Sequence, residues 1–147
     1  MRSIRVLWAK AWNKSIPSEV SCLVWSVFQN RIPTKENLFT RGMIGQGSLE
    51  CAGGCGGVEV VSHLFFECPI FTGVWASICN WLGISTALQK EGVQHPIQFE
   101  GLLGSGRVFS MCVVVVWFAC VWSVWKSRND KIFCNKEISI EKIVEEL

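Results

Sequence analysis

The stretch that decides the fold is Cys51-Ala-Gly-Gly-Cys55-Gly-Gly-Val-Glu59-Val-Val-Ser-His63-Leu-Phe-Phe-Glu67-Cys68, a glycine-rich segment with three cysteines and one histidine. These four residues follow the spacing C-x3-C-x7-H-x4-C. Zinc in proteins prefers four sulfur or nitrogen ligands at the corners of a tetrahedron. The glycines on both sides of Cys55 allow the tight turn that would place Cys51 and Cys55 along one edge of it. One helical turn, or a slightly longer loop, would bring His63 and Cys68 to the opposite edge.

The pattern therefore predicts one structural Zn²⁺, held by Cys51, Cys55, His63 and Cys68. Four protein ligands leave no open position for water, which argues against a catalytic metal. We expect Glu59 and Glu67 to support the ligands or to lie on the surface. The alternatives are incidental cysteines in a glycine-rich loop, or an oxidised Cys51–Cys55 pair.

Hydrophobic spacing predicts helices on the N-terminal side of this stretch. Between Pro17 and Pro33, apolar side chains recur at i, i+3, i+4, i+7 and i+8, which is typical of a helix with one buried face. Ser18 is the expected N-cap residue at the start of this helix. Thr34 is expected to cap a second, shorter helix that Gly42 ends.

The C-terminal side contains three further segments. A third helix is predicted from Pro69 to Leu82, followed by a loop over 84–106 with a short helical turn at 99–103. An uncharged run then spans 108–125, and the last apolar residues repeat with helical spacing from Ile140 onward.

Together these signals predict a mainly α fold. We expect a small zinc-stabilised domain of short helices with a Gly-rich metal loop and a core rich in Trp and Phe, since the chain has 147 residues with eight Trp and nine Phe. A hydrophobic helix and a short amphipathic C-terminal helix follow it. The expected division is a zinc-binding domain over 1–83, a linker over 84–106 and a helical extension over 107–147.

The uncharged run 108–125 leaves three interpretations open. Its 18 residues stand at the lower limit for a membrane helix, which needs about 20, and the Lys and Arg residues after it would place the C-terminus in the cytoplasm. It could instead be a core helix that is hydrophobic all round, or a buried strand over 113–116. We favour the core helix.

The N-terminal third is the basic part of the chain, with seven Lys or Arg against two Glu over 1–45. One hypothesis is contact with phosphates of RNA or DNA, with Trp rings stacking on bases. The cationic candidates are Lys10, Lys14, Arg31, Lys35 and Arg41. The alternative, which we favour, is a solvated helix face with Trp8, Trp12 and Trp25 in the core.

Carboxylates argue against catalysis within this chain. Asp130 is the only Asp, and the other eleven acidic residues are Glu. Polymerases and nucleases that use two metal ions need clustered carboxylates to hold them, and no paired-Asp motif exists here. We therefore expect that the chain is not itself an enzyme.

The cysteines outside the metal loop indicate a reducing compartment. They are Cys22, Cys79, Cys112, Cys120 and Cys134. Their number is odd and they fall inside helical patterns, so they are expected to be small buried hydrophobic residues. Without a secretory signal, we expect an intracellular protein of the nucleus or cytoplasm.

The order of several motifs resembles a known family. Trp8-x3-Trp12, Pro17 and Trp25 precede the segment Pro33-Thr34-Lys35-x-Asn37-Leu38-x-x-Arg41-Gly42, and the Cys/His cluster with His63-Leu-Phe-Phe-x-Cys68 and Trp75 follows. These residues resemble the zinc-binding domain that follows the reverse transcriptase of plant LINE-type non-LTR retrotransposons. The later segment Trp122-x-x-Trp125-Lys126-x-Arg128-Asn129-Asp130-x-Ile132-Phe133 resembles what comes after that domain. The family usually spaces its first two cysteines as C-x2-C, whereas three residues separate them here.

The resemblance implies a module that contacts nucleic acid or assists the polymerase core of a parent element. That core is absent from this chain, so the chain looks like a C-terminal fragment. Two alternatives remain: a decayed remnant with no selected activity, and a small membrane-anchored protein that uses helix 108–125.

Overall fold

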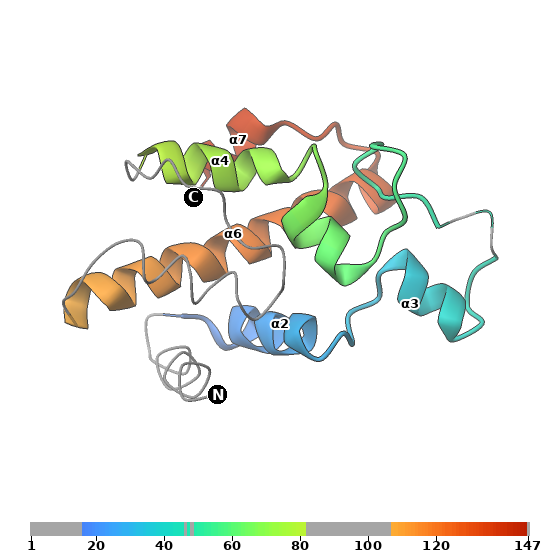
Figure 1. Ribbon diagram of the computed structural model, residues 1–147, viewed down its shortest axis with the longest axis horizontal. Coiled ribbons are helices and arrows are strands. Elements are labelled where there is room, and N and C mark those ends of the chain that lie inside the picture. The colour runs from blue at the N-terminus through green and yellow to red at the C-terminus, as the bar shows by residue number, and fades with distance from the viewer. Residues whose placement is uncertain (1–15, 46, 48, 82–106, 147) are drawn as a thin grey trace.

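The computed structural model describes residues 16–45, 47, 49–81 and 107–146. Within these residues the chain is helical, with one isolated antiparallel bridge between Glu50 and Val58. The elements are α2 (Ser18–Phe28), α3 (Lys35–Thr40), the π-helix η2 (His63–Glu67), α4 (Thr72–Trp81), α6 (Arg107–Cys134) and α7 (Ile140–Glu145) (Figure 1). The mainly α prediction is confirmed.

Helix α2 is shorter than predicted and starts differently. Pro17 occupies the N-cap position and no side chain caps the helix, so the prediction for Ser18 is wrong: Ser18 is the first helical residue. The helix ends at Phe28, before Pro33, because Asn30 takes a left-handed conformation with φ of 53°. The amide of Arg31 then donates to the carbonyl of Ser26 at 2.9 Å, which closes a Schellman-type C-terminal turn.

Helices α3 and α4 follow their local signals closely. The hydroxyl of Thr34 accepts from the Asn37 amide at 3.3 Å, and Gly42 has φ of 73° just after α3, so both predicted ends are confirmed. Helix α4 begins at Thr72 rather than Pro69, because the preceding residues form a turn in which the Thr72 amide donates to the Cys68 carbonyl. Leu82, the predicted end, lies outside the described residues.

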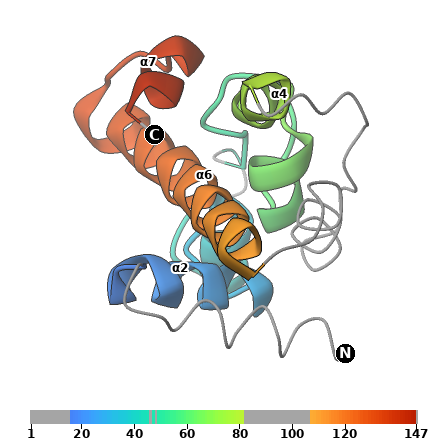
Figure 2. The same ribbon diagram turned by 90° about the vertical axis from the view of Figure 1, so that its left-hand side faces the viewer.

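Helix α6 runs through the middle of the molecule and is longer than the uncharged run 108–125 (Figure 1). Helix α2 lies on one side of it, and α4 with α7 lies on the other (Figure 2). Trp117, Phe118 and Val121 of α6 are buried, so the core-helix interpretation is confirmed and the strand interpretation is wrong. Among the helices of the described ranges, none is long and apolar enough to cross a membrane.

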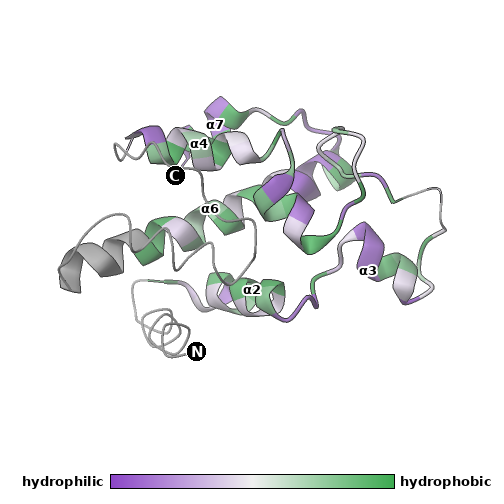
Figure 3. Ribbon diagram, in the orientation of Figure 1, coloured by the Kyte–Doolittle hydropathy of each residue, from purple (hydrophilic) through white to green (hydrophobic). Residues whose placement is uncertain are grey.

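The core is a stack of aromatic rings. Trp117 lies 5.9 Å from Phe28 of α2, 6.3 Å from Phe66 of η2 and 5.8 Å from Trp75 of α4, measured between ring centroids. The indole N–H of Trp75 donates to the Phe65 carbonyl at 2.7 Å, which satisfies the one polar atom of a buried ring. Hydrophobic and hydrophilic residues are interspersed along the ribbons of α2, α4 and α6 (Figure 3).

Some predicted core residues lie elsewhere. Trp25 is 46% exposed, because Val24 and Val27 take the inward face of α2 and leave Trp25 at its edge. Trp8 and Trp12 lie outside the described residues. Cys79 and Cys120 are buried as predicted, whereas Cys22, in the middle of α2, and Cys134, the last residue of α6, are exposed. Cys112 belongs to α6, but its side chain is outside the described part.

The core is shared between the two ends of the chain, because α6 contacts α2, η2 and α4. The linker predicted over 84–106, with its helical turn at 99–103, lies outside the described residues, and the division into 1–83, 84–106 and 107–147 stays a prediction. The short amphipathic helix expected at the C-terminus is α7. Its Ser139 hydroxyl accepts from the Lys142 amide and its Ile143 is buried.

Candidate metal centre

The structure brings the three cysteine sulfurs and a ring nitrogen of His63 together, all within 4.8 Å of one another. The Sγ atoms of Cys51 and Cys68 are 3.7 Å apart, and Cys55 Sγ lies 3.1 Å from His63 Nε2. With Zn–S bonds of about 2.3 Å and Zn–N bonds of about 2.0 Å, a tetrahedron has S···S edges of about 3.8 Å and S···N edges of about 3.5 Å. The first edge agrees with this value and the second is slightly short, so the four side chains could hold one metal ion.

The metal loop owes its shape to glycines. The Cys51 amide donates to the Gly57 carbonyl at 2.8 Å, which closes the loop around Cys55. Gly54 and Gly56 have φ of 76° and 87°, a conformation that other residues rarely adopt. At Gly57 an added Cβ would lie 2.8 Å from Cε1 of His63, so the imidazole packs directly on the backbone.

The second pair of candidate ligands sits at the two ends of a π-turn. The Cys68 amide donates to the His63 carbonyl at 2.6 Å, an i to i+5 bond that widens the turn by one residue. Leu64, Phe65 and Phe66, between them, are all buried and anchor the turn in the core. The expected turn between His63 and Cys68 is therefore present, and its apolar interior explains its position.

Burial and hydrogen bonds shift the pKa values of Cys51 and Cys55 in opposite directions. Burial raises the pKa of the Cys51 thiol. Burial also acts to raise the pKa of Cys55, but hydrogen bonds from the Gly57 amide and His63 outweigh it and lower that pKa to about 7. Zinc binds cysteine as the thiolate, and burial makes the Cys51 thiol hold its proton more tightly than an ordinary cysteine does. Metal binding must therefore displace the proton of Cys51.

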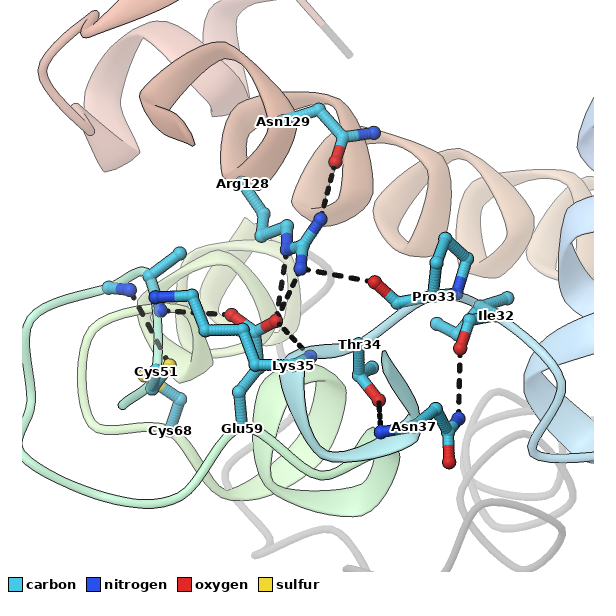
Figure 4. Close-up of polar contacts among 12 residues, drawn as sticks. Ile32, Pro33, Thr34, Lys35, Asn37, Cys51, Glu59, Cys68, Arg128 and Asn129 are labelled. Atoms are coloured by element: carbon cyan, nitrogen blue, oxygen red, sulfur yellow. Dashed lines mark hydrogen bonds and ion pairs between the residues drawn. The ribbon is translucent and has the colours of Figure 1, made fainter. Parts of the chain in front are cut away.

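Glu59 supports the metal loop from inside. Its side chain is fully buried, and its Oε2 accepts from the amide of Ala52, the residue after Cys51, at 2.9 Å. Its Oε1 accepts from the Lys35 amide at the start of α3 at 3.1 Å. Figure 4 shows this carboxylate between the loop and α3. Of the two places expected for Glu59, the structure has the supporting one, whereas Glu67 is exposed.

Arg128 of α6 completes this arrangement. Its side chain is 3% exposed, and the guanidinium donates to Glu59 Oε1 from Nε at 3.1 Å and from a terminal nitrogen at 2.5 Å. The same terminal nitrogen donates to the Pro33 carbonyl, and the group lies 4.7 Å from the ring centroid of Trp125 (Figure 4). The sequence placed Arg128 in a motif and among the cations after the run 108–125, but did not indicate that it supports the metal loop. Two features of the sequence could have indicated this pair. Arg128 is a charged residue that follows an apolar helical run, and Glu59 is an acidic residue inside a glycine-rich loop.

Three of the cationic residues predicted to contact nucleic acid, Arg31, Lys35 and Arg41, lie in the described part of the chain. Arg31 and Arg41 are exposed, and Lys35 is half-buried. Arg31 lines a groove between α2 and α6, whereas Lys35 and Arg41 do not. Lys10 and Lys14 lie outside the described residues.

The fold and the cluster define a small helical domain with a Cys/His site that could hold one metal ion. The chain belongs to the family described as zinc-binding in reverse transcriptase, whose match covers residues 2–75, about half of the chain. The resemblance seen in the sequence motifs is therefore confirmed. Zinc is the metal of this family, and the cluster agrees with one such ion.

One relative comes from a plant. The chain is similar to an Arabidopsis thaliana protein named "Putative ribonuclease H protein", with 27% identity over 126 residues. The aligned part covers 83% of this chain and 19% of that protein, so the chain spans about a fifth of the relative's length. No solved structure matches the chain.

Proposed function

We propose that Cys51, Cys55, His63 and Cys68 hold one Zn²⁺ and that this ion has a structural role. The observation that carries the proposal is the approach of all four ligand atoms to within 4.8 Å. A site with four protein ligands has no open coordination position, so the ion would stabilise the loop rather than activate a water molecule. The glycine turn and the π-turn would then be cross-linked through the metal.

We further propose that the module contacts RNA or DNA, or assists a reverse transcriptase core, and that it is not itself an enzyme. Family membership supports the link to reverse transcriptase. The single Asp of the chain supports the absence of two-metal chemistry.

A reducing compartment, the nucleus or cytoplasm, suits this proposal. The seven cysteines of the described part are all free, including the three of the cluster. Thiolates bind zinc only while they remain reduced.

Native mass spectrometry of the purified chain tests the metal proposal. We expect one zinc per chain, lost in Cys51→Ser and in His63→Ala together with cooperative unfolding. Cys22→Ser and Cys134→Ser are matched controls, because both cysteines are exposed and outside the cluster, and should keep the metal. A chain that folds cooperatively without metal would contradict the proposal.

Filter binding over a salt series tests the nucleic-acid proposal. Contacts to phosphates make the affinity fall as salt rises, because bound counterions are released. A signal that is absent, or that does not change with salt, would end this proposal and leave the zinc site unaffected.

A further inference from the structure

A groove of about 480 Å³ lies between α2 and α6. Helix α2 lies on the side of α6 away from α4 (Figure 2). Its walls include Trp122, Trp125 and Lys126 of α6 and Arg31 of the loop after α2. It lies away from the metal cluster, since none of the four candidate ligands lines it.

Two tryptophans form the aromatic part of this groove. Trp122 and Trp125 are three residues apart on α6, so they share one face of the helix, and both are half-buried. Trp125 is held in place, because it stacks on Phe65 at 6.3 Å and the Arg128 guanidinium lies 4.7 Å from its centroid. A ring that is already immobilised loses little conformational entropy when a ligand stacks on its remaining surface.

Two cations accompany these rings. Arg31 is exposed and forms no ion pair with a described residue. Lys126 lies 4.0 Å from Glu146, and both side chains are more than half exposed, so this pair holds the ammonium only weakly. Glu19 is the only acidic residue of the lining, which leaves the groove with a net positive charge.

We propose that this groove binds single-stranded nucleic acid, with bases stacked on Trp122 and Trp125 and phosphates on Arg31 and Lys126. Stacking surfaces next to cations are how proteins bind single strands without reading a sequence. The inference rests on the proposed nucleic-acid contact and names its surface. It shares only Arg31 with the cations that the sequence suggested, and it adds three residues from α6.

Fluorescence anisotropy with labelled ten-nucleotide RNA and DNA strands tests this surface on the zinc-loaded full chain. Arg31→Ala/Lys126→Ala should lower the slope of log affinity against log salt by about 1.4, since each phosphate on a single strand contributes about 0.7. The control Lys136→Ala/Lys142→Ala removes the same charge from exposed residues outside the groove and should leave the slope unchanged.

The tryptophans supply a second readout. Trp122→Ala should weaken binding about tenfold, the loss expected from one stacked base. Trp81→Ala is its control, because Trp81 is 76% exposed on α4 and does not line the groove. Glu19→Gln should tighten binding, because it removes the one negative charge of the lining.

The outcomes distinguish failure of nucleic-acid binding by the chain from failure of the groove as the binding surface. If the unaltered chain binds neither strand, the proposed nucleic-acid contact fails and this inference fails with it. If the chain binds, but the groove variants bind as well as their controls, the contact stands and the groove is overturned. The groove is also overturned, and the contact still stands, if the control variants and the groove variants lose the same amount of affinity. RNA and DNA affinities then identify the preferred strand.

Discussion

The buried ion pair between Glu59 and Arg128 gives the sharpest test of how the metal loop is held. Arg128→Met keeps an unbranched apolar stem but removes four hydrogen bonds, two to Glu59, one to the Pro33 carbonyl and one to Asn129 Oδ1. Glu59 would then be a fully buried carboxylate with only the amides of Ala52 and Lys35 as donors.

The expected loss is large compared with the stability of a small domain. Removing one partner of a buried ion pair costs about 3–5 kcal/mol, because the remaining charge stays desolvated. A domain of this size is stable by about 5–15 kcal/mol, so much of the total is at stake. With a urea m-value of about 2 kcal/mol/M, the unfolding midpoint should fall by about 2 M.

Urea unfolding of the zinc-loaded chain, followed by circular dichroism, measures this loss. Lys126→Met is the matched control, because Lys126 lies two residues earlier on α6 and pairs only with exposed Glu146, so its change should stay below about 1 kcal/mol. Glu59→Gln/Arg128→Met should be less destabilised than the two single changes added together, because no unpaired charge remains. A loss below about 1 kcal/mol in Arg128→Met, or strict additivity in the double variant, would refute the reasoning.

Three further changes test other contacts. Gly57→Ala should weaken zinc binding in a chelator competition, because its Cβ would lie 2.8 Å from the His63 ring, whereas Gly45→Ala, with open space around its Cβ, should not; equal affinities would contradict this packing. Burial raises the pKa of Cys120 above the ordinary thiol value of 9.0. The unfolded chain therefore loses this proton at a lower pH than the folded chain. As a result the free energy of unfolding falls above about pH 9, by up to about 1.4 kcal/mol per pH unit. This alkaline decline, followed by urea titrations, should become shallower in Cys120→Ala and is disproved if it does not. Removing zinc with a chelator should abolish cooperative thermal unfolding in calorimetry; an unchanged transition would exclude a structural role for the metal.

Local patterns explain why part of this structure could be predicted. The candidate ligands lie within 18 residues of one another, and the glycines between them are required by a loop that only a few backbone conformations can close. The Thr34 cap and the Gly42 stop act within one helical turn. In each case the residues that make the contact are neighbours in sequence, so the spacing alone carried the information.

Predictions from the sequence were wrong where two local arrangements of the chain had nearly equal free energies. Ser18 is a good capping residue, but Pro17 precedes it and starts the helix with its carbonyl, which accepts from Val20 and Ser21. Pro33 is a helix breaker, but Asn30 ends α2 earlier through a left-handed turn. Trp25 is a large apolar residue, yet the angular position of Val24 and Val27 decided which face of α2 is buried.

By itself, the sequence determined the helical segments, the glycine-rich loop and the set of residues able to bind zinc, because these depend on contacts between near neighbours. Only the tertiary structure decided that α6 is the central helix, that Glu59 is buried against an arginine 69 positions away, and that Arg31 meets Trp122 and Lys126 across one groove (Figure 1). Such contacts depend on how whole faces of helices pack together. No spacing along the chain encodes that packing, because it minimises exposed apolar surface over the molecule as a whole.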